Sequence, residues 1–223
     1  DDDVDVGMPR PDYQRLIALS ACLAEETGYQ LEGLKGQPAA IAPIVKVCDK
    51  KIGVFERGGM GEGSLWLDVF PIDGLPDNED EARKHCKKIW RKRMMLVAQT
   101  SPVSSAKTFR RRLAKALAKA SRLFSNPRKL STQITALARQ YAFDECSMVN
   151  AVTWANTGFA GRFHRSAFDS VNQMPFEDVT VDVISEYDRS LTGAYGDYMR
   201  VPPENERETH SLQAWERSEP PAV

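Results

Sequence analysis

DDDVDVG, residues 1–7, opens the chain and decides how its fold begins. Charged and apolar residues alternate in it as in a half-buried β-strand, so Asp1, Asp3 and Asp5 share one face while Asp2 and the valines lie on the other. Side chains at i and i+2 on a strand are ~6.5–7 Å apart. Two such carboxylates can hold one divalent ion, or two ions placed ~3.5–4 Å apart. Because three carboxylates on one face repel one another without a cation, we expect a metal here; a solvated acidic turn is the alternative.

A later stretch, residues 64–70 (SLWLDVF), predicts a second acidic strand. Its aliphatic residues point to one face, and Asp68 lies on the other face between Trp66 and Phe70. A lone carboxylate between two large aromatic residues costs free energy unless it has a partner or a function. An edge position facing water is the other interpretation. Two acidic positions on one strand plus one on a later strand are typical of nucleotidyltransferase-type folds that carry out metal-assisted phosphoryl chemistry.

The rest of the N-terminal part predicts an α/β or α+β core. Helix and strand periods alternate in it, and Gly and Pro separate them. The expected elements are a helix over residues 11–27 ended by Gly28, a pair of strands over 41–48 and 51–55 around Asp49-Lys50, a glycine-rich loop over 58–63, and the strand 64–70, which ends at Pro71 before a turn at Asp73-Gly74.

The middle of the chain is strongly basic. Residues 82–143 hold 17 of the 30 Lys and Arg residues and no Asp or Glu, which leaves a net charge of −18 on the rest. Helices are predicted over 79–99, 105–124 and 129–145. In the second of them an apolar stripe is surrounded by Arg and Lys, with ~100° between successive residues; its members are Phe109, Leu113, Ala116, Leu117, Ala120 and Phe124. Packing inside the protein explains the stripe, whereas the missing carboxylates favour an acidic partner over a helix that covers the molecule's own acidic surface.

Composition narrows the class of protein further. The chain has 223 residues with 42% hydrophobic residues and no apolar run of the ~18–20 residues that cross a membrane. Its four cysteines are far apart and form no CxxC pair, so we expect reduced thiols in a cytoplasmic protein. The three histidines fit no zinc or nucleophile pattern.

Four stretches together resemble one family. They are DDDVDVGMP, PIVKVCDKK, SLWLDVFPIDGLP and YGDYMRVPPENERETH, in that order, and the resemblance runs from Asp1 to about His210. They resemble the LicD family of bacterial phosphocholine transferases, which has the eukaryotic fukutin-type ribitol-phosphate transferases as relatives. The likeness is strong at these motifs and weak through the basic helices.

The resemblance implies an α+β fold with a nucleotidyltransferase-like mixed sheet and a basic helical insertion. It implies a divalent metal, Mg²⁺ with Mn²⁺ as an alternative, and a CDP-activated donor such as CDP-choline. By position, Asp3, Asp5 and Asp68 match the catalytic metal ligands, Asp1 is an additional ligand, and Asp68 is alternatively a general base. Lys46 is expected to bind the phosphates of the substrate. The residues expected to offer aromatic faces to a quaternary ammonium are Trp66, Phe70, Tyr195 and Tyr198. Asp73 and Asp197 are expected to bind substrate because they fall in family motifs.

The resemblance also suggests how the chain is organised. Family members carry a glycine-containing helix and a PW-type lead-in before the acidic strand, so we expect an N-terminal part of the core to lie outside this sequence. The expected parts are a catalytic core over 1–78, a basic helical region over 79–145, a C-terminal part over 146–215 with a strand-rich stretch over 148–184 and a helix over about 185–194, and a disordered tail over 216–223.

Together these features predict transfer of phosphocholine to a sugar hydroxyl of a teichoic-acid or lipopolysaccharide precursor. The acceptor is expected to be an anionic, lipid-linked glycan, and residues 82–143 are expected to give peripheral contact with the inner face of the membrane. Three alternatives stay open: transfer of another phospho-alcohol such as ribitol phosphate from a CDP donor, true nucleotidyl transfer, and a non-enzymatic basic module that binds membranes or polyanions. Nucleic acid is not the expected partner.

Overall fold

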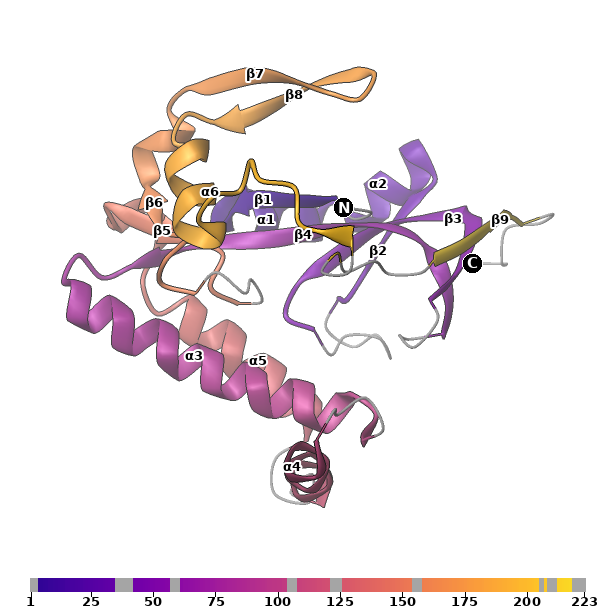
Figure 1. Cartoon of the computed structure of the whole chain (residues 1–223). Coiled ribbons are helices and arrows are strands. Elements are labelled where there is room, and N and C mark those ends of the chain that lie inside the picture. Colours follow the sequence, from indigo (N-terminus) through magenta and orange to yellow (C-terminus); the bar gives the residue numbers. More distant parts are fainter. Residues whose placement is uncertain are drawn as a thin grey trace. The chain divides into compact units, whose positions relative to one another are not determined.

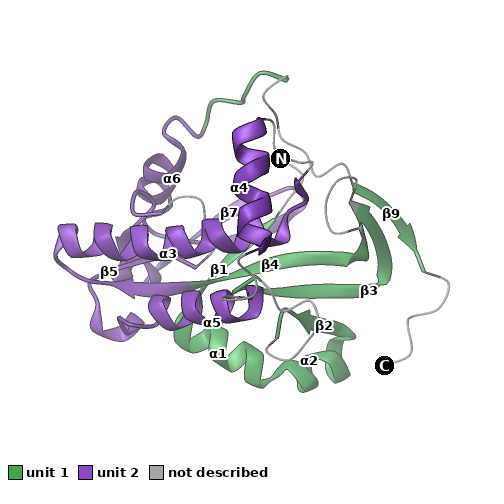
Figure 2. Ribbon diagram, turned by 90° about the horizontal axis from the view of Figure 1, so that it is seen from below, with its two compact units in different colours: residues 1–71, 199–223 green, residues 72–198 purple. Residues whose placement is uncertain are grey.

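The computed structural model describes residues 4–34, 42–56, 61–103, 108–120, 126–153, 158–204, 207 and 212–217 (Figure 1). It is a mixed α+β structure, as the sequence predicted, with antiparallel strand pairs and helices. The chain divides into two compact units, residues 1–71 with 199–223 and residues 72–198 (Figure 2). Among the described helices, none has the length and apolar character to cross a membrane. All four cysteines are free thiols, in agreement with their spacing in the sequence.

The sheet of the first unit is built around two long strands. Strand β3 pairs antiparallel with β4 on one side, and on its other side it pairs with β2 along its first half and with β9 along its second half. Strand β1 pairs with β4. The strands are β1 (Asp5–Pro9), β2 (Tyr29–Glu32), β3 (Val45–Glu56), β4 (Gly61–Leu75) and β9 (Leu212–Glu216).

One face of this sheet carries the apolar core of the unit. Leu31, Val45 and Val69 come from three adjacent strands and are buried together with Tyr13. Helices α1 (Arg10–Ala18) and α2 (Ser20–Thr27) supply the residues packed against them, among them Leu16, Ile17 and Leu23. The alternation of side chains along a strand then directs the even-numbered residues over 46–48 of β3 and over 66–70 of β4 to the opposite face.

The predicted single helix over 11–27 is two helices. The backbone leaves helical geometry at Leu19, with φ −89° and ψ 9°, and α2 begins at the next residue. The break allows Ile17 of α1 and Leu23 of α2 both to reach the core cluster. Gly28 ends α2 as predicted, in the left-handed conformation at φ 78°, which a glycine adopts without steric cost.

The predicted pair of strands around Asp49-Lys50 is wrong, because β3 runs through this point as one strand. A bulge takes the place of the turn: Asp49 pairs with Leu65 and Gly53 with Ser64, so that residues 50–52 have no partner in β4. Strand β4 is also longer than predicted at both ends. It includes Gly61–Gly63 of the expected glycine-rich loop, whose residues 58–60 lie outside the described part.

The strand end at Pro71 and the turn at Asp73-Gly74 are likewise corrected, because β4 continues to Leu75. Residues Asp73 and Gly74 pair with Asn150 and Val149 of β5 (Met148–Asn150). Glycine is required at position 74 by a close approach: a Cβ atom there would lie 2.7 Å from the carbonyl oxygen of Ala142. The Asp-Gly pair thus serves strand packing and not a turn.

The second unit contains the basic helices. Helix α3 packs against both α4 and α5. The buried residues of α3, Ala82, Cys86, Ile89, Arg93 and Leu96 among them, recur every three to four positions, as expected for one face of a helix. The side chains of Asn78 and Asn126 cap α3 and α5 by accepting hydrogen bonds from backbone N–H groups at 3.1 and 2.8 Å. The helices are α3 (Glu79–Thr100), α4 (Phe109–Ala120) and α5 (Pro127–Ala138). The third was predicted to reach residue 145, but it ends at Ala138, and residues 143–145 form a separate 3₁₀ turn.

The remainder of this unit forms short strands and one helix, as the pattern over 148–194 predicted. Its apolar cluster contains Ile72, Phe143, Val149, Phe163 and Ala167. Strands β7 and β8 form a separate hairpin. These elements are β6 (Phe163–His164), β7 (Val171–Phe176), β8 (Val179–Ile184) and α6 (Tyr187–Tyr195), with 3₁₀ turns over Phe143–Glu145 and Arg165–Phe168.

The predicted tail over 216–223 is corrected at its start. Glu216 belongs to β9, and the backbone N–H of Arg217 donates to the carbonyl oxygen of Lys51 at 2.8 Å. Gly53 on β3 lies beneath Trp215 of β9, where any Cβ atom would overlap the indole ring. Residues 218–223 lie outside the described residues.

Candidate active site

Asp68 occupies the face of the first unit's sheet that is opposite the core, as the alternation in SLWLDVF predicted. Val69 is buried in the core cluster, so its neighbour Asp68 points the other way. Lys46 is directly opposite Asp68 in the β3–β4 register. The Lys46 Nζ lies 3.1 Å from Asp68 Oδ1, and the two side chains are 21% and 13% exposed. The expected phosphate-binding lysine and the expected carboxylate therefore form one ion pair.

Trp66 joins this pair on the same face. It lies two residues before Asp68 on β4, and the Lys46 ammonium sits 4.1 Å from the centroid of its ring. Such an approach is a cation–π interaction. Trp66 was expected to offer an aromatic face to a substrate cation, and in this structure a lysine ammonium lies over that ring. Phe70, the other expected aromatic residue on this strand, follows at the next position of the same face and is half-buried.

Two polar atoms of this group are buried and lack hydrogen bonds within the described part of the chain. They are Asp68 Oδ1, which is close to Lys46 without hydrogen-bond geometry, and Trp66 Nε1. A buried acceptor or donor without a partner costs about 1–3 kcal/mol. A bound water, an ion or a ligand can supply the partner that such a group lacks. The ion pair is thus electrically balanced but not saturated with hydrogen bonds.

The surroundings of the pair are poorly solvated. Cys48 is directly opposite Trp66 in the β3–β4 register and is buried. Burial, and after it the negative charge of Glu32, raises the pKa of the Cys48 thiol to about 12. The thiol is therefore neutral and is no nucleophile at physiological pH. Charges in such an environment interact more strongly than they do in water.

Asp5 lies on β1, a strand that pairs with β4, the strand of Asp68. Strand β1 pairs with β4, and Met8 of β1 packs against the core cluster. Because side chains alternate, Asp5 is on the face opposite Met8, which is the face of Asp68 and Lys46. Asp5 is exposed and has a polar interaction of its own. Asp5 and Asp68 are thus on paired strands and on the same face of the sheet. That the two carboxylates lie close together stays a prediction.

Asp1 and Asp3, the other predicted metal ligands, lie outside the described residues. Within those residues, no group of three or more His, Cys, Asp and Glu side chains is arranged to hold a metal ion. The described donors fit a divalent cation in kind, because carboxylate oxygens are the ligands that Mg²⁺ and Mn²⁺ prefer. The buried Asp68 Oδ1, without a hydrogen bond, is the specific atom that a cation would satisfy.

The other predicted substrate-binding residues belong to the second unit. Asp73 is buried on β4 opposite Asn150 and has an interaction partner. Tyr195 is the exposed last residue of α6, and Asp197 follows it, also exposed. The Tyr198 hydroxyl donates to Asp188 Oδ1 at 2.8 Å, and this hydrogen bond raises the pKa of Tyr198 above its ordinary value.

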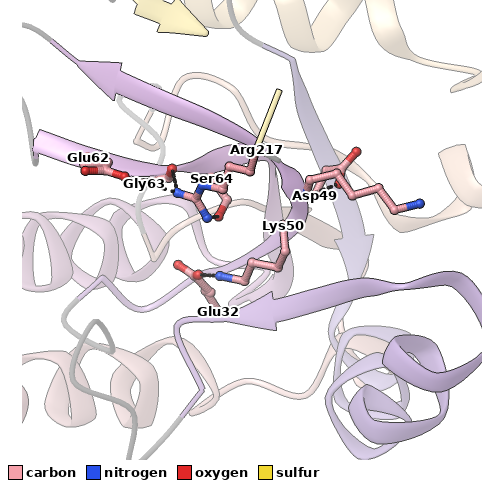
Figure 3. A network of polar contacts seen from close by, with 8 residues as sticks. Glu32, Asp49, Lys50, Glu62, Gly63, Ser64 and Arg217 are labelled. Atoms are coloured by element: carbon pink, nitrogen blue, oxygen red, sulfur yellow. Dashed lines mark hydrogen bonds and ion pairs between the residues drawn. The ribbon is translucent and has the colours of Figure 1, made fainter. Parts of the chain in front are cut away.

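The structure adds polar residues that the sequence analysis missed (Figure 3). Glu32 of β2, Lys46 of β3 and Asp68 of β4 stand in one row across three strands. Glu32 forms an ion pair with Lys50, which lies four residues after Lys46 on β3. The sequence did contain a signal for Glu32. Leu31 lies between Gln30 and Glu32, and this alternation indicates a strand with Leu31 on its inner face and Glu32 on its polar face.

Arg217 forms the second missed group, at the bulged end of the sheet (Figure 3). Its guanidinium donates to the carbonyl oxygen of Gly63 at 2.6 Å and to Ser64 Oγ at 3.4 Å, and it lies 3.7 Å from Glu62. These contacts fix the C-terminal strand on the start of β4. The alternation of LQAWE over 212–216 was a strand signal that the prolines of the following residues obscured.

Comparisons with known proteins give one relative of stated activity. The chain is similar to the lipopolysaccharide cholinephosphotransferase LicD of Haemophilus influenzae, with 25% identity over 229 aligned positions. The alignment covers 96% of this chain and 79% of the relative. No protein-family model matches the chain, and no solved structure matches it.

Proposed function

Because the chain belongs to the LicD family, we propose that it transfers phosphocholine from CDP-choline to a sugar hydroxyl of a cell-surface glycopolymer precursor, of the lipopolysaccharide or teichoic-acid type. The relative's name supports the transferred group and the kind of acceptor. The CDP donor and the divalent metal, Mg²⁺ or Mn²⁺, come from the motifs and are part of the proposal. A nucleotidyltransferase-like fold for the core is proposed on the same basis.

The observation that carries the proposal is the pair of carboxylates on adjacent strands. Asp5 and Asp68 share the polar face of the first sheet, and Asp68 Oδ1 is buried without a hydrogen bond. The same oxygen lies 3.1 Å from the Lys46 ammonium, so a bound cation would share the carboxylate with the lysine. Asp5 and Asp68, with Asp1 and Asp3 as further ligands, would hold the cation, whose charge would offset the charge on the donor's diphosphate.

Lys46 would bind the donor's phosphates directly. Its ammonium lies against Asp68 without a hydrogen bond between them, and it makes no hydrogen bond to any other described residue. An ammonium has three N–H donors, so phosphate oxygens can accept from Lys46 while the ion pair to Asp68 is kept or loosened. The ring of Trp66 also lies 4.1 Å from this ammonium and contributes a cation–π contact.

The proposed reaction exchanges one phosphorus–oxygen bond for another. The acceptor hydroxyl attacks the choline-bearing phosphorus, the bond from that phosphorus to the bridging oxygen breaks, and CMP leaves with that oxygen. Asp68 would accept the proton of the attacking hydroxyl, or would act only as a ligand if another base is used. Trp66 and Phe70, both in the first unit, are proposed as aromatic faces for the choline ammonium. Asp73, Tyr195, Asp197 and Tyr198 belong to the second unit and stay candidates on their motifs alone.

Product analysis by ³¹P NMR tests the proposal. The chain is incubated with CDP-choline, Mg²⁺ and purified lipopolysaccharide, and we expect CMP and a new phosphodiester to appear. In Asp68→Asn we expect the rate to fall by about 10²-fold or more. Lys50→Met is the matched control, because it removes another lysine from the same face of β3 and should leave the products unchanged.

The outcomes separate the alternatives. A product from CDP-ribitol but not from CDP-choline would keep the reaction type and replace the donor. Release of free phosphocholine with cytidylyl transfer to the acceptor would indicate nucleotidyl transfer. No turnover of either donor, with salt-sensitive binding of the lipopolysaccharide unchanged in Asp68→Asn, would favour the non-enzymatic polyanion-binding module and contradict the proposal.

A further inference from the structure

Helix α4 presents its apolar stripe to solvent. Phe109, Leu113 and Leu117 recur every four residues along one side of the helix and are 78%, 51% and 63% exposed. The buried residue of α4 is Ala118. It lies five positions after Leu113, which places it ~140° around the helix from the stripe. The sequence-based expectation that packing inside the protein explains this stripe is therefore not met.

The opposite side of α4 is the side that attaches it to the rest of its unit. Helix α4 packs against α3, as Figure 1 shows. The ammonium of Lys115 donates to the carbonyl oxygen of Pro102 at 3.2 Å, in the segment that follows α3. With Ala118 and Lys115 directed inward, the helix holds the stripe outward. Three large apolar side chains in a row on an exposed surface form the kind of patch that marks an interaction site.

The charges around the stripe are all positive. Helix α4 contains five basic residues and no acidic one; the basic residues are Arg110, Arg111, Arg112, Lys115 and Lys119. Arg110 lies ~60° from Leu113 on one side, and Arg112 lies ~100° from it on the other. Basic residues thus border the apolar stripe on both sides. Long cationic side chains in this position can extend toward phosphate groups while the stripe is buried.

We propose that α4 is a lipid-docking helix that lies in the surface of an anionic bilayer with Phe109, Leu113 and Leu117 buried between the acyl chains. An anionic bilayer interacts with both parts of this surface. The acyl chains bury the apolar stripe, and the phosphate headgroups attract the basic residues that border it. A nucleic acid would pair with the charges but would leave the apolar residues in water. A second copy of α4 would cover the stripe but would bring two sets of five positive charges together. The proposal goes beyond the transfer reaction and does not depend on it.

Vesicle flotation of the whole chain tests the proposal. The vesicles contain phosphatidylcholine alone or phosphatidylcholine with about 30 mol% phosphatidylglycerol, each at low and high salt. We expect binding to the anionic vesicles that high salt weakens, and binding to the neutral vesicles that is at least ~10-fold weaker. The triple variant Phe109→Gln, Leu113→Gln, Leu117→Gln should lose at least ~10-fold of the affinity at unchanged charge. Arg110→Gln with Arg112→Gln, which removes one basic residue from each border, should lose affinity for the anionic vesicles only.

A matched control removes as many exposed apolar side chains elsewhere. Leu19, Val171 and Val179 are each more than half exposed and lie outside α4, so Leu19→Gln, Val171→Gln, Val179→Gln should bind like the parent chain. Circular dichroism checks that all variants keep their helix content. Equal binding of the parent and the stripe variant would overturn the proposal. So would a dimer in sedimentation equilibrium that the stripe variant converts to a monomer, without any vesicle binding by the parent.

Discussion

Replacing Lys46 by methionine removes a positive charge from a nearly buried carboxylate and keeps the length of the side chain. The Lys46 Nζ is 3.1 Å from Asp68 Oδ1, and the Asp68 side chain is only 13% exposed. Removing one partner of a fully buried ion pair costs about 3–5 kcal/mol, whereas an exposed pair contributes at most about 1 kcal/mol. Since this pair is between these limits, we expect Lys46→Met to lower the free energy of unfolding by about 2 kcal/mol.

Urea unfolding followed by circular dichroism measures this loss, and a lower melting temperature by about 4–8 °C should accompany it. Lys50→Met is the control, because the Lys50 side chain is 19% exposed, close to the 21% of Lys46, but its partner Glu32 is 35% exposed. We expect it to cost about 1 kcal/mol or less. If Asp5 and Asp68 bind a divalent cation, millimolar Mg²⁺ should restore part of the loss in Lys46→Met and none of the loss in Lys50→Met.

A double-variant comparison shows whether the cost comes from the stranded carboxylate. In an Asp68→Asn background no charge is left unpaired, so Lys46→Met should cost less than about 0.5 kcal/mol there. An equal cost in both backgrounds would refute the reasoning, because it would mean that Lys46 stabilises the fold through its contact with Trp66 alone.

Three further predictions follow from buried groups. Gly53→Ala should lower the free energy of unfolding by about 1–3 kcal/mol because its Cβ atom meets the Trp215 indole, and in urea unfolding most of this cost should vanish in a Trp215→Ala background. Cys48, whose pKa burial raises to about 12, should react with a disulfide reagent at pH 8 at least ~10²-fold more slowly than exposed Cys22; equal rates in a thiol-release assay would contradict its burial. Burial lowers the pKa of His85 below its ordinary 6.5. As the pH falls below 6.5 the unfolded chain is protonated at His85 before the folded chain is, so the free energy of unfolding decreases. In His85→Phe, the urea midpoints measured above and below pH 6.5 should differ less than in the parent chain.

The alternation of the two acidic strands was the most informative part of the sequence. It predicted that Asp68 and Trp66 share the face opposite Val69, and the core cluster confirms this. The basic helices were also predicted, because Asn-Pro at 126–127 and the apolar period of α3 are strong local signals. Such signals are set by residues within one turn or one pleat of each other, which a single sequence displays directly.

What the sequence could not predict depends on contacts between distant segments. The Asp49-Lys50 pair has the composition of a turn but forms a bulge, because β2 and β9 each cover half of the other edge of β3. Asp73-Gly74 is a residue pair typical of turns, but Gly74 is needed because the carbonyl oxygen of Ala142 comes close to its Cα. The outward direction of the α4 stripe depends on which side packs against α3, and the helical period is the same for an inward or an outward stripe.

Calorimetric titration of the chain with CDP-choline, with and without Mg²⁺, tests the central claim most directly. CDP-ribitol is the comparison ligand, and a chain that carries Asp5→Asn and Asp68→Asn is the control. The account predicts Mg²⁺-dependent binding of CDP-choline that the double substitution weakens by about 10-fold or more. Binding that neither Mg²⁺ nor the two substitutions change, or the absence of binding to either CDP compound, would contradict it.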